Sequence, residues 1–155
     1  MIEDRLLHTN IGKALYVATK AHDGQVDKAG VPYMYHVTDV WHRTIRKGLS
    51  EVAQVCAILH DVVEDSIYIS CADIQNMFGY EIAMTVNMLT RPDGMSVEKY
   101  YERVLSDEIA VQVKLCDVES NVARLAYLDD EDLKARLGAK YIKALGLLRS
   151  KVTSN

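Results

Sequence analysis

Apolar residues recur at three- and four-residue spacing through most of this 155-residue chain, and this helical period constrains the fold more than any other feature. In the first such segment, roughly 3–22, the spaced residues are Leu7, Ile11, Ala14, Leu15, Ala18 and Ala21. Only two prolines occur, Pro32 and Pro92, and each lies near a glycine in a predicted loop or turn. No segment shows a sustained two-residue strand period, so we predict an all-α fold.

Capping residues divide the helical pattern into segments. Ser50, Ser70 and Ser96 are suited to cap three helices, and Ser70 with Asp73 matches a capping box. After the first helix, the stretch HDGQVDKAGVPYMYH breaks the period and is predicted to be a loop. Further helices are expected at 36–46, 51–65, 70–79, 80–90, 96–105, 107–128 and 129–148. Residues 1–155 are therefore expected to form a single domain, a bundle of about seven to eight helices.

Composition excludes several classes of partner. The net charge of -4 offers no basic surface for nucleic acid. No stretch approaches the roughly 18 to 20 apolar residues of a membrane span, and the N-terminal sequence MIEDRLLHTN is too polar for a signal peptide. The three cysteines, Cys56, Cys71 and Cys116, are odd in number and widely spaced, which indicates reduced, buried thiols. We expect a cytoplasmic protein, either a monomer or a small homo-oligomer.

Residues 60–65, HDVVED, place a histidine and three carboxylates at the end of the apolar run EVAQVCAIL. On a continuous helix over 51–65, His60 and Glu64 share a face, and Asp61 and Asp65 share the neighbouring one. Carboxylates crowded at the negative end of a helix are repelled by each other and by the helix dipole. A divalent cation would offset that repulsion, and imidazole with carboxylate suits Mn²⁺, Fe²⁺ or Zn²⁺.

Two other segments offer the remaining metal ligands. Asp117 directly follows the apolar run in VQVKLCDVESN, and His36 follows PYMY. Taken singly, His36 is better explained as a loop or helix-cap histidine, and Asp117 as a surface acid or an ion-pair partner of Lys114. However, three separate segments each end an apolar run with a ligand-type residue. A shared metal site would explain all three together, and it is the alternative to the separate explanations.

The motifs KALYVATKAHDGQVDKAGVPYMYH, AILHDVVEDS, FGYEIAMTVNMLTR and VKLCDVESN together resemble a known family. In this order, over roughly 6–127, they are similar to the HD-domain hydrolases of the RelA/SpoT type, in particular the small stand-alone alarmone hydrolases. The resemblance implies an all-helical HD domain that binds one Mn²⁺, or another divalent transition metal. It also implies removal of the 3′-pyrophosphate from guanosine tetra- or pentaphosphate, giving GDP or GTP and pyrophosphate.

The resemblance also implies roles for individual residues. By this match, the metal ligands are His36, His60, Asp61 and Asp117. The catalytic pair beside the attacking water is Glu64 and Asp65. The substrate-binding residues are Lys28 and Asn121. One position departs from the family pattern, because Asp27 stands where the family's guanosine tetraphosphate hydrolases typically carry an arginine. An aspartate cannot stack on a base as a guanidinium does, but it can accept a hydrogen bond from a base amino group.

Several other residues have both a functional and a plain explanation. The substrate phosphates require cations, for which the nearest candidates are Lys28 and Lys114, and the weaker ones Arg91 and Arg124; each is otherwise a surface charge. Tyr33 or Tyr35 either packs on a base or is a core tyrosine. His22 is expected to order the loop with Gln25, and His42 to be a surface or packing residue.

The leading hypothesis is a metal-dependent phosphohydrolase acting on a guanosine alarmone. Its nearest rival is an HD phosphohydrolase acting on another nucleotide, such as an adenosine alarmone or a nucleoside monophosphate, and Asp27 is the feature that supports it. Two further hypotheses do not involve an enzyme. The chain could be a nucleotide sensor that binds without turnover, or a purely structural helical bundle. In the structural bundle, Asp61→Ala would be neutral or stabilising, because a buried charge would be removed.

Overall fold

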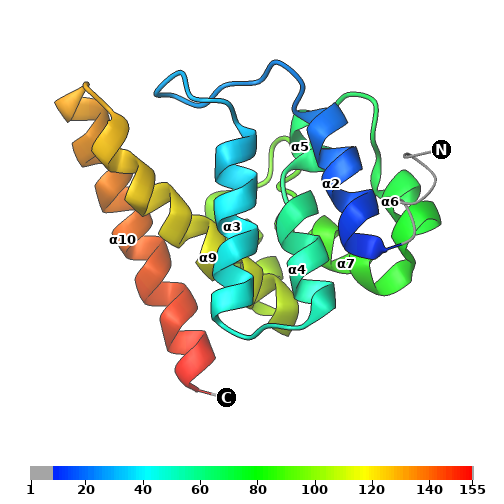
Figure 1. The fold of residues 1–155 in the computed structure, drawn as a ribbon. Helices are drawn as coiled ribbons and strands as arrows, with labels where there is room; N and C mark the ends of the chain where they lie inside the picture. The colour runs from blue at the N-terminus through cyan, green and yellow to red at the C-terminus, as the bar shows by residue number, and fades with distance from the viewer. Residues whose placement is uncertain (1–8, 155) are drawn as a thin grey trace.

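The computed structural model describes residues 9–154, and within them the fold is all-helical, as predicted (Figure 1). Eight helices of two turns or more are α2 (Asn10–Ala21), α3 (Met34–Arg46), α4 (Glu51–Leu59), α6 (Cys71–Phe78), α7 (Tyr80–Leu89), α8 (Val97–Leu105), α9 (Glu108–Arg124) and α10 (Glu131–Thr153). The shorter elements are the single turn α5 (Val62–Asp65) and the 3-10 turn η1 (Leu125–Tyr127). The only extended pairing among the described residues is one isolated bridge, between Val26 and Pro32.

The predicted caps begin the helices where the sequence places them. The side chains of Ser50 and Ser96 accept hydrogen bonds from the first turns of α4 and α8. Ser70 and Asp73 form the complete capping box of α6. The first helix was expected over 3–22; its described part begins at Asn10, capped by Thr9, and the predicted residues 3–8, with Leu7, lie outside the described residues.

Helix α4 forms the centre of the core. Val55, Cys56, Ala57, Ile58 and Leu59 are all fully buried, because α4 packs against α2, α3, α7 and α9. A helix that is buried all round needs an almost wholly apolar sequence, which EVAQVCAIL provides. Any polar group at its C-terminal end is therefore delivered to the interior of the bundle.

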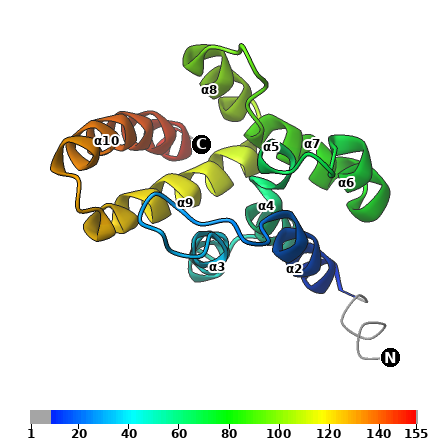
Figure 2. The ribbon, with the colours of Figure 1, turned by 90° about the horizontal axis from the view of Figure 1, so that it is seen from above.

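Helix α9 crosses the bundle and carries α10 along one side (Figure 2). The loop between α2 and α3 extends over the C-terminal part of α9, which it contacts. No helix in the described part of the chain is both long enough and apolar enough to cross a membrane. All three cysteines are free thiols; Cys56 and Cys116 are buried, and Cys71 is half-buried.

The continuous helix expected over 51–65 is interrupted. Helix α4 ends at Leu59, and Asp61, at φ -107° and ψ -1°, lies between it and the separate turn α5. This backbone region is sparsely allowed and often holds active-site residues. The two shared faces that a continuous helix would give to residues 60–65 are therefore not formed.

Candidate metal centre and adjoining cavities

Three distant segments deliver four ligand-type side chains to one point inside the bundle. His36 lies in the first turn of α3, His60 and Asp61 lie at the α4–α5 break, and Asp117 lies within α9. Both histidines and Asp117 are buried, as expected for residues that follow apolar runs. The structure thus brings together all four residues that the sequence singled out as metal ligands.

The imidazole Nε2 atoms define the centre of this cluster. The Nε2 atoms of His36 and His60 are 3.3 Å apart. Asp117 Oδ1 lies 3.1 Å from Nε2 of His36 and 3.6 Å from Nε2 of His60. Asp61 Oδ2 lies 2.9 Å from Nε2 of His60, and ligand atoms of His36, His60 and Asp61 all lie within 4.8 Å of one another.

Hydrogen bonds on the far side of each ring fix which nitrogen faces the cluster. His60 Nδ1 lies 2.7 Å from the carbonyl oxygen of Ala57, which can only accept, so Nδ1 carries the hydrogen. His36 Nδ1 lies 3.0 Å from the hydroxyl of Ser120 on α9. Both Nε2 atoms thereby face the cluster, as in metal sites whose histidines are oriented by outer partners.

The donor set fits a divalent cation. Two imidazoles and two carboxylates at these distances need a positive charge among them, which a proton on an imidazole or a divalent cation bound to the Nε2 atoms can supply. Burial alone would raise the pKa of Asp117, but Lys114 and the two histidines hold that pKa well below its ordinary value. The carboxylate is therefore ionised and able to bind a metal, and two nitrogen with two oxygen donors suit Mn²⁺, Fe²⁺ or Zn²⁺.

Tyr33 is a partner that sequence reasoning did not find. Its hydroxyl donates a hydrogen bond to Oδ2 of Asp61, and burial together with Asp61 raises its pKa far above the ordinary value. Tyr33 is thus neither simply a core residue nor free to lie flat on a base, whereas Tyr35 is exposed. The tyrosine just before α3 helps to orient a carboxylate that follows α4, a pairing that no local pattern encodes.

Glu64 and Asp65 diverge from each other. Glu64 Oε2 accepts a hydrogen bond from the backbone N–H of Arg91 at 3.0 Å. Asp65 Oδ2 accepts one from Nε2 of Gln25 at 2.8 Å. Desolvation, with a smaller contribution from Asp61, raises the pKa of Glu64 above its ordinary value. The two acids therefore line two different hollows beside the cluster.

Glu64 lines the first hollow, the cationic cavity, of about 320 Å³. Its wall includes the cluster acids Asp61 and Asp117 and three basic residues, Arg91, Lys114 and Lys140. Lys114 Nζ contacts Asp117 Oδ2 at 2.7 Å. Burial and the neighbouring charges of Lys114, Lys28 and Arg91 lower the pKa of Lys140. Lys140, on α10, is a cation that sequence reasoning missed, because its segment lies beyond the quoted motifs.

Asp65 lines the second hollow, the loop cavity, of about 410 Å³. This cavity lies between the α2–α3 loop and the α9–α10 turn, and its wall includes Tyr33, Asp65, Asn121, Arg124, Leu125, Leu128, Leu137 and Tyr141. The predicted substrate residue Lys28 lines it too. Asn121 and Tyr141 line both cavities, so the two hollows adjoin. Asn121 also donates to Asp117 Oδ1 at 2.9 Å, which ties it to the cluster.

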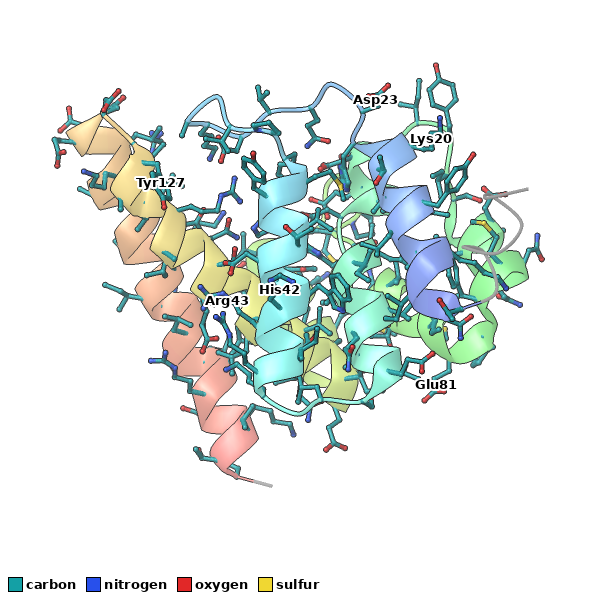
Figure 3. The ribbon with its side chains drawn as sticks, in the orientation of Figure 1. Lys20, Asp23, His42, Arg43, Glu81 and Tyr127 are labelled. Atoms are coloured by element: carbon teal, nitrogen blue, oxygen red, sulfur yellow. The ribbon has the colours of Figure 1, made fainter. Side chains whose placement is uncertain are left out.

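The two other histidines in residues 9–154, His22 and His42, lie where the sequence suggested. His22 Nδ1 lies 2.8 Å from Gln25 Oε1, so the pair does order the loop, and through Gln25 it also supports Asp65. His42 is exposed on α3, away from the cluster (Figure 3). The cluster therefore uses only His36 and His60 of the histidines in residues 9–154.

Comparison with known protein families gives one match over most of the chain. The model of a family described as HD domain matches residues 14–130. That range contains the four cluster residues, Glu64, Asp65 and Asn121.

Individual relatives have names concerned with guanosine nucleotides. A GTP pyrophosphokinase of Myxococcus xanthus is 27% identical over 135 residues, which are 78% of this chain and 18% of the relative. A guanosine-3′,5′-bis(diphosphate) 3′-pyrophosphohydrolase of Haemophilus influenzae is 29% identical over 123 residues, 72% of this chain and 18% of the relative. The chain thus spans under a fifth of the length of these relatives.

One solved structure shares the fold. It is described as a metazoan ortholog of SpoT that hydrolyzes ppGpp and plays a role in starvation responses. The TM-score is 0.80 at 22% identity, with 92% of this chain and 87% of that chain covered. The likeness extends over nearly the whole bundle.

Proposed function

Because this chain belongs to the HD-domain family, we propose that it is a divalent-metal-dependent phosphohydrolase that removes the 3′-pyrophosphate from a guanosine alarmone. The products would be GDP or GTP and pyrophosphate, and the metal we favour is Mn²⁺. The observation that carries the proposal is the convergence of His36, His60, Asp61 and Asp117 at one point beside a cavity lined by cations. The names of the relatives support the choice of substrate class.

The two cavities suggest how such a substrate would lie. Phosphate groups need positive charge, which Lys114, Lys140 and Arg91 supply in the cationic cavity. A purine base needs an apolar, flat enclosure, and the leucine side chains of the loop cavity meet that need. The ribose with its 3′-oxygen would then lie near Asn121, which both cavities share.

Proton handling is assigned to Glu64. The cluster residues would hold the cation, which when bound supplies polarisation of water and of phosphoryl oxygens. A water oxygen bonds to the phosphorus attached to the 3′-oxygen, that P–O bond breaks, and the 3′-oxygen leaves with a proton as a hydroxyl. Glu64 faces the cationic cavity with a raised pKa, which suits a group that takes up and returns a proton. Asp65, held by Gln25, is assigned to orienting groups from the opposite side.

A turnover panel with Mn²⁺ tests the proposal. Guanosine and adenosine 3′-pyrophosphates would be compared with simple nucleotides, and pyrophosphate release would be measured for wild type and Asp61→Ala. We expect release from the guanosine alarmone by wild type and none by Asp61→Ala, which loses a cluster ligand. Glu81→Ala removes an exposed carboxylate on α7 and serves as the matched control (Figure 3).

Other outcomes would redirect the assignment. Orthophosphate released only from nucleoside monophosphates would identify a different HD phosphohydrolase. A metal-loaded protein that binds the alarmone and leaves it intact would instead be a nucleotide sensor. Full activity of Asp61→Ala would remove the metal cluster from the mechanism altogether.

A further inference from the structure

Asp27, the residue that departs from the family pattern, forms a partly buried ion pair with Arg124. Asp27 Oδ2 lies 2.6 Å from Nη2 and 3.2 Å from Nε of Arg124, at the end of α9. The side chains of Asp27 and Arg124 expose only 10% and 20% of their surface. A pair removed from water to this degree is retained only with good geometry and further hydrogen bonds, unlike a solvated surface pair.

All the acceptor sites of Asp27 are in use. Its Oδ1 accepts hydrogen bonds from the backbone N–H groups of Ala29 and Val31, at 2.8 and 2.9 Å. Its Oδ2 accepts the two bonds from Arg124. An ionised carboxylate offers about four lone-pair sites, and four donors fill them here. Asp27 therefore has no site left for the amino group of a base.

Arg124 keeps one nitrogen free of Asp27. Nε and Nη2 are committed to the carboxylate, whereas Nη1 lies 3.4 Å from Asn121 Oδ1, at the long end of hydrogen-bond distance. The guanidinium centre lies 5.8 Å from the Tyr33 ring centroid, and Arg124 lines the loop cavity. The Asp27–Arg124 pair thus presents donors to that cavity and no acceptor.

We propose that Arg124 is a specificity-determining residue that selects an oxo-purine, of the guanine type, over an amino-purine, and that Asp27 is the residue that positions it. This inference rests on the proposed function. Guanine presents two acceptors, O6 and N7, on one edge, where adenine presents the N6 amino donor beside N7. N7 is an acceptor in both bases, so the discrimination lies at O6, to which Nη1 can donate and where adenine presents the N6 amino donor. The base preference therefore comes from α9 rather than from the loop.

The test compares guanosine and adenosine forms of the same ligand. We would measure kcat/KM for the two 3′-pyrophosphates, and Kd for GDP and ADP by calorimetry, in wild type, Arg124→Ala, Arg124→Lys and Asp27→Asn. We expect wild type to prefer guanosine by about tenfold or more, the size of one good base contact. Arg124→Ala should lose most of this preference through weaker guanosine recognition. Arg124→Lys keeps the charge without the planar fork and should not restore the preference.

Asp27→Asn tests the positioning role. It should lower the guanosine-to-adenosine ratio of kcat/KM several-fold and leave Mn²⁺ affinity unchanged, because only the ion pair that orients Arg124 is weakened. Arg149→Ala, which removes an exposed arginine of α10, is the matched control and should keep the wild-type ratio.

The outcomes separate this inference from the proposed function. An unchanged guanosine-to-adenosine ratio of kcat/KM in Arg124→Ala would overturn the inference. If the melting temperature fell while this ratio stayed the same, the ion pair would be purely structural. Should Arg124→Ala fail to fold, an unchanged ratio in both Arg124→Lys and Asp27→Asn would overturn it equally. A wild type that hydrolyses no alarmone but binds GDP over ADP through Arg124 would reject the proposed function and retain the inference.

Discussion

The cationic cavity and the loop cavity adjoin, share Asn121 and Tyr141, and differ in nearly everything else. The cationic cavity is lined by three basic residues and four acids, of which three belong to the HDVVED and VKLCDVESN motifs and the fourth is Asp93. The loop cavity is lined by three leucines, by Lys28 and Asp65, and by an arginine that is paired with Asp27. In the proposed function, the basic residues of the first cavity bind the phosphates, whereas the shape and hydrogen-bond pattern of the second select the base.

The largest expected effect comes from removing the proposed metal cluster, which reaches the cationic cavity through Asp61 and Asp117. His60→Ala should lower Mn²⁺ affinity by more than the roughly 10- to 100-fold that losing an outer partner costs, because a direct ligand is gone. Turnover of every substrate should be lost together. Calorimetry with Mn²⁺ and melting curves with and without it measure this, since a bound metal stabilises the folded state. His42→Ala, on the exposed face of α3, should behave as wild type; Mn²⁺ affinity kept by His60→Ala would contradict the cluster.

A smaller effect, confined to the cationic cavity, is expected for Glu64→Gln. Loss of a general base typically lowers kcat by about 10²- to 10⁴-fold. A base must be deprotonated, so the wild-type rate should fall as pH falls through the pKa of Glu64, which lies above the ordinary 4.5. A pH profile of kcat/KM should show this acidic limb in wild type and in Glu81→Gln, but not in Glu64→Gln. If the limb persists in Glu64→Gln, another group is the base.

The smallest expected effect comes from Lys140→Met, and it tests most directly whether the two cavities have separate roles. Lys140→Met removes one phosphate-facing cation and should raise KM by about tenfold, which corresponds to about 1.4 kcal/mol. The increase should be equal for guanosine and adenosine substrates, because phosphate contacts carry no base information. Steady-state kinetics measure it, with Lys143→Met on the same helix as control. A change in the guanosine-to-adenosine ratio would show that the two cavities are not separate in function.

Local sequence was sufficient for most helix starts; for the cluster it gave candidates, and the family resemblance was needed to assign His36 and Asp117 as ligands. Ser50, Ser96 and the Ser70–Asp73 box cap their own first turns, so a few adjacent residues determine where each helix begins. The cluster residues were found because each follows an apolar run that has to be buried.

Features that depend on distant partners were not predictable in the same way. The segment EVAQVCAILHDVVED reads as one helix, and its interruption at Asp61 accompanies a hydrogen bond from Tyr33, 28 residues away. The partner of Asp27 is 97 residues away, on α9. Neither separation leaves a periodic or spacing signal in the sequence. The prediction of a monomer or small homo-oligomer remains a prediction.

The adjacency of His60 and Asp61 affects how readily the cluster can assemble during folding. Two of its four side chains come from consecutive residues, so bringing them together requires no chain closure at all. Only α3 and α9 have to be recruited, and the first of these closures spans just 24 residues. Since closure entropy rises slowly with loop length, most of the ordering is already provided by the helix packing that forms the core. A cation arriving at the folded bundle would therefore find its binding groups preorganised.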